Sequence, residues 1–104
     1  MVYFDNAATT SLDPEVKAVL IDVLDTFGNP SSTHAEGRKA RALVETARKE
    51  IAALVGCTPG EIIFTSGGTE ADNWALKGAV RDLGVRRILT SPVEHHAVLH
   101  VAEE

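Results

Sequence analysis

The chain has 104 residues, of which 44% are hydrophobic and 24% charged, and ten basic against fifteen acidic side chains give a net charge of −5. This is the composition of one globular domain or part of one; no stripe of lysine and arginine indicates nucleic acid. No apolar run approaches the roughly 20 residues that span a bilayer, and no charged-then-apolar leader is evident. We therefore expect no membrane contact and a cytoplasmic location.

Two amphipathic helices are predicted in the first half of the chain, after a short extended start at residues 2–4. Asp13 and Pro14 are typical of the N-cap and first position of a helix, whose apolar face runs to Phe27 and which Gly28 should end. A longer helix should run from about Ala35 to Val55 and end at Gly56. The Asn- and Ser-rich segment 29–33 is a predicted loop.

Strands and helices alternate in the second half. Thr58 and Glu61 have capping-box spacing in a turn that leads into a predicted strand at 62–64. A helix should begin near Thr69 and end at Gly84, followed by a second strand at 87–91 and a further helix over 95–104. A strand, a helical crossover and a second strand predict a parallel pair, and hence an α/β fold of parallel strands with covering helices.

The turn Gly67-Gly68-Thr69 is the best candidate for a binding site. It follows the apolar run Ile62 to Phe64 and opens a helix. Glycines let the backbone approach a ligand closely, and the free N–H groups and dipole of a helix start favour an anion such as phosphate. Thr69 provides a hydroxyl, either as an N-cap or as a donor to phosphate. Many strand-to-helix turns contain glycine and bind nothing, so this signal is weak alone.

Cys57 is the only cysteine, so no intramolecular disulfide or multi-cysteine metal site can form within these residues. It follows Gly56 at the end of a predicted helix, where a small half-buried thiol is a structural residue. We interpret it as structural rather than as a nucleophile.

Four segments, taken in order, resemble the opening of a cysteine desulfurase, a pyridoxal-phosphate (PLP) enzyme of the class V aminotransferase group. They are Tyr3 to Thr10, Phe27 to His34, Gly67 to Glu70, and Ser91 to Leu99. The resemblance runs from about residue 2 to residue 104. Because complete enzymes of this family are several times longer, it implies the N-terminal part of a fold-type-I large domain, similar to that of aspartate aminotransferase. Residues 1–34 would form an arm, a helix and a loop at the active-site mouth, and residues 35–104 the incomplete start of the PLP-binding α/β domain.

The resemblance also implies roles for individual residues. Gly68 and Thr69 would bind the PLP phosphate, and His95, the first histidine of the Glu-His-x-Ala-Val pattern, would stack on the pyridine ring and could carry a proton at the substrate amine. Without the other motifs His95 would be read as a helix cap. Glu70 is open between interaction with the helix dipole and a role at the cofactor.

The evidence for a functional role is weaker at the other candidate residues. His96 should face solvent, and no metal site is expected from His95 and His96, because adjacent side chains point apart. Asn6, Ala7, Asn29 and His34 lie in segments that the family places near the mouth and the dimer contact, although turn geometry alone explains such asparagines.

The implied activity removes sulfur from L-cysteine, giving alanine and an enzyme persulfide for iron–sulfur cluster assembly or other sulfur transfer. The partners would be a sulfur-acceptor or scaffold protein and a second copy of the complete enzyme. The Schiff-base lysine, the ring-nitrogen aspartate and the catalytic cysteine are not matched here, so the 104-residue piece alone is predicted to be inactive. The alternatives are a selenocysteine lyase or other class V PLP enzyme, a non-catalytic α/β module for a phosphorylated ligand, and a scaffold chain. No Walker-type lysine or G-x-G-x-x-G motif supports the module.

Overall fold

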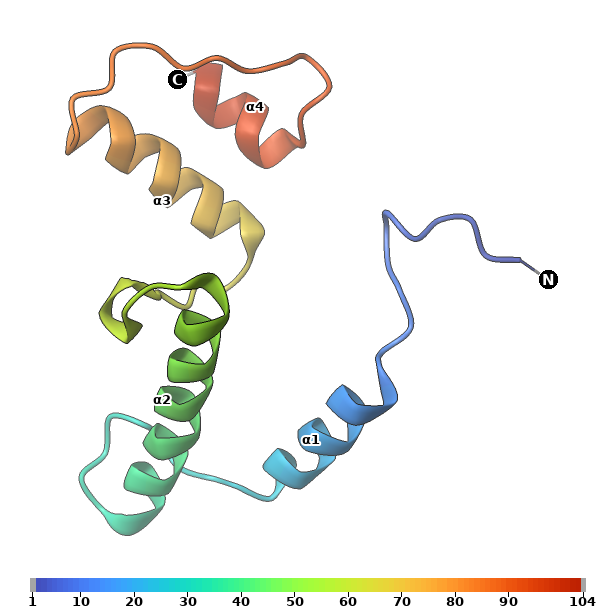
Figure 1. Ribbon diagram of the computed structural model, residues 1–104, viewed down its shortest axis with the longest axis vertical. Coiled ribbons are helices and arrows are strands. Elements are labelled where there is room, and N and C mark those ends of the chain that lie inside the picture. The colour runs from blue at the N-terminus through green and yellow to red at the C-terminus, as the bar shows by residue number, and fades with distance from the viewer. Residues whose placement is uncertain (1, 104) are drawn as a thin grey trace. The chain divides into compact units, whose positions relative to one another are not determined.

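The computed structural model describes residues 2–103, and within this range all the regular structure is helical (Figure 1). The elements are α1 (Pro14–Leu24), α2 (Ala35–Val55), the short 3-10 helix η1 (Pro59–Glu61), α3 (Gly68–Arg81) and α4 (His96–Glu103). The chain divides into two compact units, one up to Ile62 and one from Ile63 onward, and each is described by itself.

The first unit contains α1, α2 and η1. Asp13 caps α1 as predicted, since its side chain accepts the Glu15 N–H at 2.8 Å and Pro14 follows it. The predicted end of α1 is wrong, because the helix stops at Leu24 rather than reaching Gly28. Asp25 and Thr26 have poor helix propensity, and Gly28, at φ +144°, lies where an added Cβ would meet the Glu36 carbonyl oxygen at 2.5 Å.

The predicted bounds of α2 are confirmed, and Gly56 closes it in the left-handed conformation at φ 72°. Its buried residues include Gly37, whose helix position allows the 29–33 loop to approach closely: an added Cβ would lie 2.5 Å from the Ser32 carbonyl oxygen. After α2, the Thr58 amide donates to the Glu61 carboxylate at 2.8 Å, which confirms the predicted capping box. Arg48 then links α2 to the chain beyond η1 by donating to the Ile62 carbonyl oxygen.

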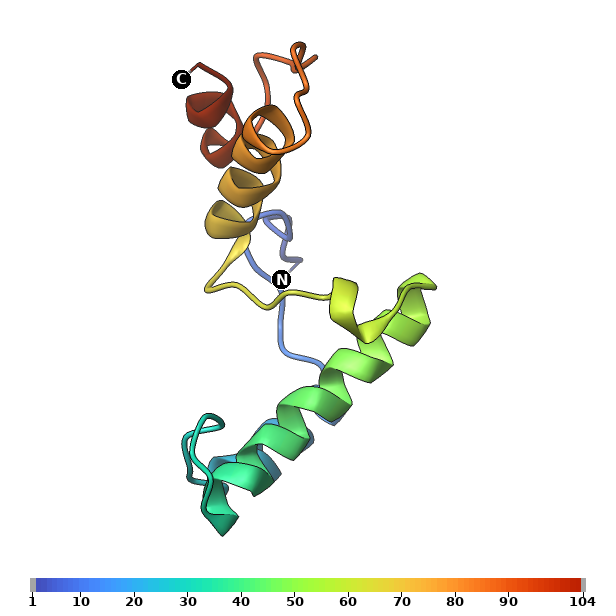
Figure 2. The same ribbon diagram turned by 90° about the vertical axis from the view of Figure 1, so that its left-hand side faces the viewer.

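The second unit contains α3 and α4, which pack against each other. In both Figure 1 and Figure 2 the two helices run in the same general direction, so their N-termini lie at the same end of this unit. The predicted starts of both helices are confirmed to within one residue, and Gly84, at φ 68°, follows α3 where a helix end was predicted.

The predicted strands are not observed in residues 2–103. The segments 62–64 and 87–91 carry no ladder, although the backbone of Ile62 is extended at φ −94°, ψ 121°. A strand exists only where a neighbouring extended segment accepts and donates its backbone hydrogen bonds, and neither segment has such a neighbour among these residues. The expected parallel pair is therefore absent from the part of the chain that the structure describes.

Few side chains are buried in the described part of the chain. Among the described residues the buried apolar side chains are Ala40, Ala52 and Ala97, and the most deeply buried, Ala52, is 1% exposed. The apolar faces of the helices have the predicted periodicity but remain largely exposed, with Phe27 at 74% and Leu54 at 86%. No described helix is both long and apolar enough to cross a membrane.

Candidate functional site

The turn that opens α3 is built by local hydrogen bonds. Gly67 is the N-cap of the helix and Gly68 its first residue, so Thr69 lies at the second helical position and not at the N-cap. The Thr65 hydroxyl donates to the Gly67 carbonyl oxygen at 3.0 Å, and the Asn73 side chain donates to the Thr69 carbonyl oxygen at 2.9 Å. These bonds hold the turn without using the hydroxyl of Thr69.

Glu70 caps the same turn from inside the helix. Its carboxylate accepts the Ser66 amide at 2.8 Å and the Ser66 hydroxyl at 2.6 Å. These bonds lower the pKa of the Glu70 carboxyl below its ordinary value, and the bond from the hydroxyl has the larger effect. The capping interpretation of Glu70 therefore has direct support, and Ser66, which the sequence analysis did not single out, is its partner. The signal was a serine four residues before a glutamate at a helix start.

The capping bonds leave the first helical amides available. An α-helix provides no internal acceptor for its first N–H groups, and the backbone bonding of α3 begins with the Ala71 amide, which donates to the Gly67 carbonyl oxygen at 3.2 Å. No hydrogen bond is seen from the amides of Gly68 or Thr69 to any residue from 2 to 103. These donors, with the Thr69 hydroxyl and the positive end of the helix dipole, form an anion-binding arrangement.

Neither backbone conformation nor packing within the described residues requires glycine at Gly67 or Gly68. Gly67 has φ 171°, which is extended backbone that any residue adopts, and a Cβ added at Gly67 or Gly68 would meet nothing within 4 Å. This contrasts with Gly37, which backbone atoms crowd. The described residues therefore leave the side of the turn where a Cβ would lie open. Helix-start N–H groups without acceptors, on backbone that side chains do not cover, are of the type that binds a phosphate group.

His95 is the N-cap of α4. Its Nδ1 accepts the Ala97 amide at 3.1 Å, and its carbonyl oxygen accepts the Val98 amide at 2.8 Å. Because Nδ1 acts as an acceptor, the proton of the neutral ring lies on Nε2. The side chain is exposed, so its ring is accessible to a ligand. The cap role, which the sequence alone would assign, thus accompanies any role at a cofactor.

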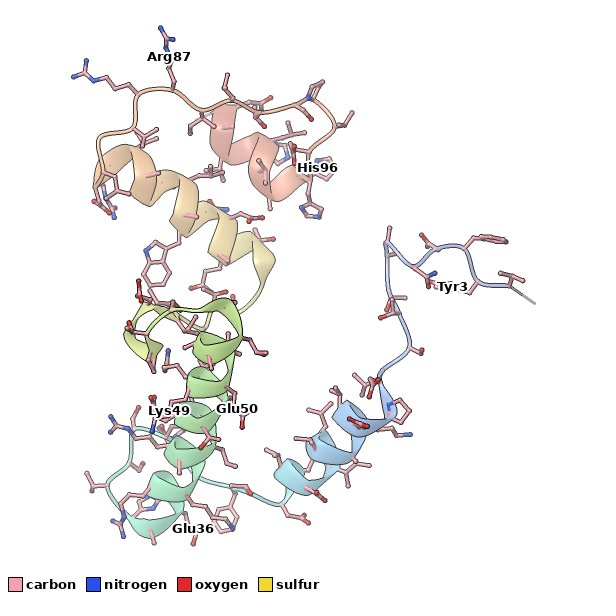
Figure 3. All side chains as sticks on the ribbon, in the orientation of Figure 1. Tyr3, Glu36, Lys49, Glu50, Arg87 and His96 are labelled. Carbon is pink, nitrogen blue, oxygen red and sulfur yellow. The ribbon has the colours of Figure 1, made fainter. Side chains whose placement is uncertain are left out.

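The structure brings Gly68, Thr69 and His95 into one unit, on two helices that pack together and start at the same end (Figure 1). The remaining candidates, which include Asn29 and His34, belong to the other unit. Asn29 accepts the Ser31 amide at 2.9 Å in a local turn, and His34 caps α2 by accepting the Gly37 amide at 3.3 Å. Their observed contacts are therefore backbone caps and turns. Figure 3 shows the side chains of both units.

Comparison with known proteins identifies the family. Residues 2–104 match the family model described as Aminotransferase class-V. The putative cysteine desulfurase IscS 1 of Bacillus subtilis (strain 168) is 51% identical over 107 residues, a match that covers 99% of this chain and 28% of the relative. The cysteine desulfurase IscS of Methanosarcina thermophila is 50% identical over 103 residues, covering 95% of this chain and 25% of the relative.

A solved structure agrees with these matches. The chain superposes on a NifS-like protein with a TM-score of 0.85 and 42% identity, covering 98% of this chain and 29% of that one. The chain belongs to the aminotransferase class-V family, whose members generally use PLP. It spans about a quarter of the length of the curated relatives it matches.

Proposed function

We propose that this chain is part of a PLP-dependent cysteine desulfurase, which takes sulfur from L-cysteine and gives alanine and an enzyme persulfide. Relatives at about half identity that are described as cysteine desulfurases support this proposal. They favour it over a non-catalytic phosphate-binding module and over a scaffold chain. The observation that supports the proposal in the structure is the α3 start, where Gly67 and Gly68 have open space at their Cβ positions and Thr69 follows in the first helical turn.

In this proposal Gly68 and Thr69 hold the cofactor phosphate. Their amides and the Thr69 hydroxyl donate charge-assisted hydrogen bonds, and the dipole of the 14-residue helix α3 favours the dianion. The Glu70 carboxylate accepts hydrogen bonds from the amide and the hydroxyl of Ser66, so its negative charge is already compensated within the turn.

His95 provides the flat face for the pyridine ring. The Ala97 amide fixes its Nδ1, which restricts the ring to orientations in which Nε2 points away from α4. The Nε2 proton is therefore the one available at the substrate amine. PLP, when bound, supplies the electron sink that makes bonds at the substrate α-carbon labile. The lysine, aspartate and cysteine that complete this chemistry have no match among the residues of this chain.

We further propose the setting of this piece within the complete enzyme. Residues 1–34 form the arm and mouth loop, and 35–104 begin the PLP-binding domain, in which the segments 62–64 and 87–91 are strands of a parallel sheet that further residues of the enzyme complete. The complete enzyme is a cytoplasmic homodimer, and a sulfur-acceptor or scaffold protein receives the sulfur for cluster assembly or another pathway. The exposed apolar faces of both units support completion by further protein.

Replacement of His95 by asparagine tests the site, because it separates the two roles of this residue. Asparagine is a good N-cap, so α4 should persist, whereas the aromatic face is lost. In the complete enzyme we expect His95→Asn to change the absorbance spectrum of bound PLP and to slow alanine formation from L-cysteine. The matched control, His96→Ala, should leave both unchanged. If His96→Ala is the damaging change, the assignment is displaced by one residue, and if neither variant has an effect, His95 does not contact the cofactor.

A further inference from the structure

Two histidines of α4 stack on each other outside the proposed cofactor site. His96 and His100 are four residues apart, and their rings lie parallel, with centroids 5.5 Å apart and an interplanar angle of 13°. Both side chains are exposed, and Figure 3 labels His96 at the first turn of α4. Residues at i and i+4 share one face of a helix, so the pair is a fixed product of the helix geometry.

We propose that His96 and His100 form a binding site for a borderline divalent cation of the Zn²⁺, Ni²⁺ and Cu²⁺ class. Neutral imidazole is the preferred nitrogen ligand of these ions, and two histidines at i and i+4 of a helix can bind one ion from consecutive turns. Metal–nitrogen bonds of about 2.0–2.1 Å require side-chain rotation from the stacked arrangement, and both side chains are exposed.

Glu103 lies near His100 on the same helix. Its Oε2 is 3.9 Å from His100 Nδ1, which is too far for a hydrogen bond but puts a carboxylate on the Nδ1 side of the ring, so Nε2 is the nitrogen that we assign to the ion. Within residues 2–103 no three histidine, cysteine or acidic side chains converge on one point. The site therefore has two protein ligands, and water or another small ligand completes the coordination.

His95 is not a member of this site. Its Nδ1 is occupied by the Ala97 amide, and its ring meets that of His96 edge to face, at a centroid distance of 6.1 Å and an angle of 62°. The adjacent histidines His95 and His96 were predicted not to form a metal site together, and in the structure His96 stacks on His100. A bound ion links the first two turns of an eight-residue helix, so it should also steady the cap formed by His95.

Titration of the protein with Ni²⁺, without an affinity tag and without added cofactor, tests the proposal. We expect one site by calorimetry, and the imidazole proton signals of His96 and His100 should broaden first in NMR spectra. His96→Gln/His100→Gln should weaken this binding at least about tenfold, equivalent to 1.4 kcal/mol. Glutamine has good helix propensity, so the variant should keep α4. Acid should release the ion, because protons compete for the same nitrogens.

His34→Gln is the matched control, since His34 is the N-cap of α2 and has no histidine neighbour at helical spacing. It should bind Ni²⁺ as the unchanged protein does. Equal binding by the double variant, or equal broadening of all four histidines, would overturn the proposal. If the spectrum of the double variant shows loss of α4, single His96→Gln and His100→Gln variants decide, because each must weaken the binding.

Discussion

Replacement of Gly68 by alanine should separate the stability of the chain from its capacity to bind phosphate. Gly68 is the first residue of α3, and a Cβ there meets no atom within 4 Å. Without cofactor, the change should be neutral or stabilise the protein by up to about 1 kcal/mol, because alanine loses less backbone entropy than glycine in a helix.

The added methyl group lies on the turn that we propose to hold the phosphate, at a position that is open in the described chain. A phosphate that retreats from it loses at least one charge-assisted hydrogen bond, which costs about 1.5–3 kcal/mol. PLP affinity of the complete enzyme should therefore fall by about 10- to 150-fold. Equilibrium dialysis measures the affinity, and thermal unfolding of the cofactor-free protein measures the stability. Gly60→Ala, which also enters open space, is the control. A less stable protein with unchanged PLP affinity would refute the argument.

Three further changes probe the same units. Thr69→Val should weaken PLP binding by about 1.5–3 kcal/mol, whereas Thr69→Ser should retain most of it, as equilibrium dialysis would show. The pKa of the Glu70 carboxyl is lowered by the Ser66 hydroxyl and amide, so its contribution to stability is present above its ordinary pKa and disappears as the pH falls through the lowered value. The protection factor of the Ser66 amide, which is its exchange rate compared with the intrinsic rate at the same pH, should fall in acid, and Glu70→Gln should abolish that pH dependence. Gly37→Ala should destabilise the 29–33 loop and α2 by about 1–3 kcal/mol in chemical denaturation, because the new Cβ meets the Ser32 carbonyl oxygen at 2.5 Å.

The helices could be predicted from the sequence because their signals are local. Asp13-Pro14 and Gly56 fix helix ends through their own backbone and side-chain chemistry, and each was found where predicted. The predicted end of α1 at Gly28 is wrong because close packing against Glu36, which is a tertiary contact, explains that glycine. Strand formation at 62–64 depends on hydrogen-bonding neighbours, and periodicity within the segment carries no information about them.

Only part of the candidate site could be predicted from the sequence. The Gly-Gly-Thr turn followed by a helix was evident from residue types, since free amides and glycine are sufficient to suggest an anion. The bonding of Glu70 to Ser66 was left open, because a carboxylate at a helix start satisfies both the dipole and a cap. The stacked pair of His96 and His100 was not predicted, because which rings of a helix meet depends on the side-chain rotamers as well as on the spacing of four residues.

Caps and cofactor groups use different atoms of the same turns. Glu70 binds both donors of Ser66, and this leaves the amides of Gly68 and Thr69 free. The Nδ1 and carbonyl oxygen of His95 accept hydrogen bonds from the first amides of α4, so Nε2 and the ring remain available to a ligand. The helix starts are therefore complete before any ligand arrives, and the ligand would meet groups that are already oriented. Such preorganisation reduces the ordering cost of binding. It also explains why a substitution that preserves a cap, such as His95→Asn, is a more informative test than removal of the side chain.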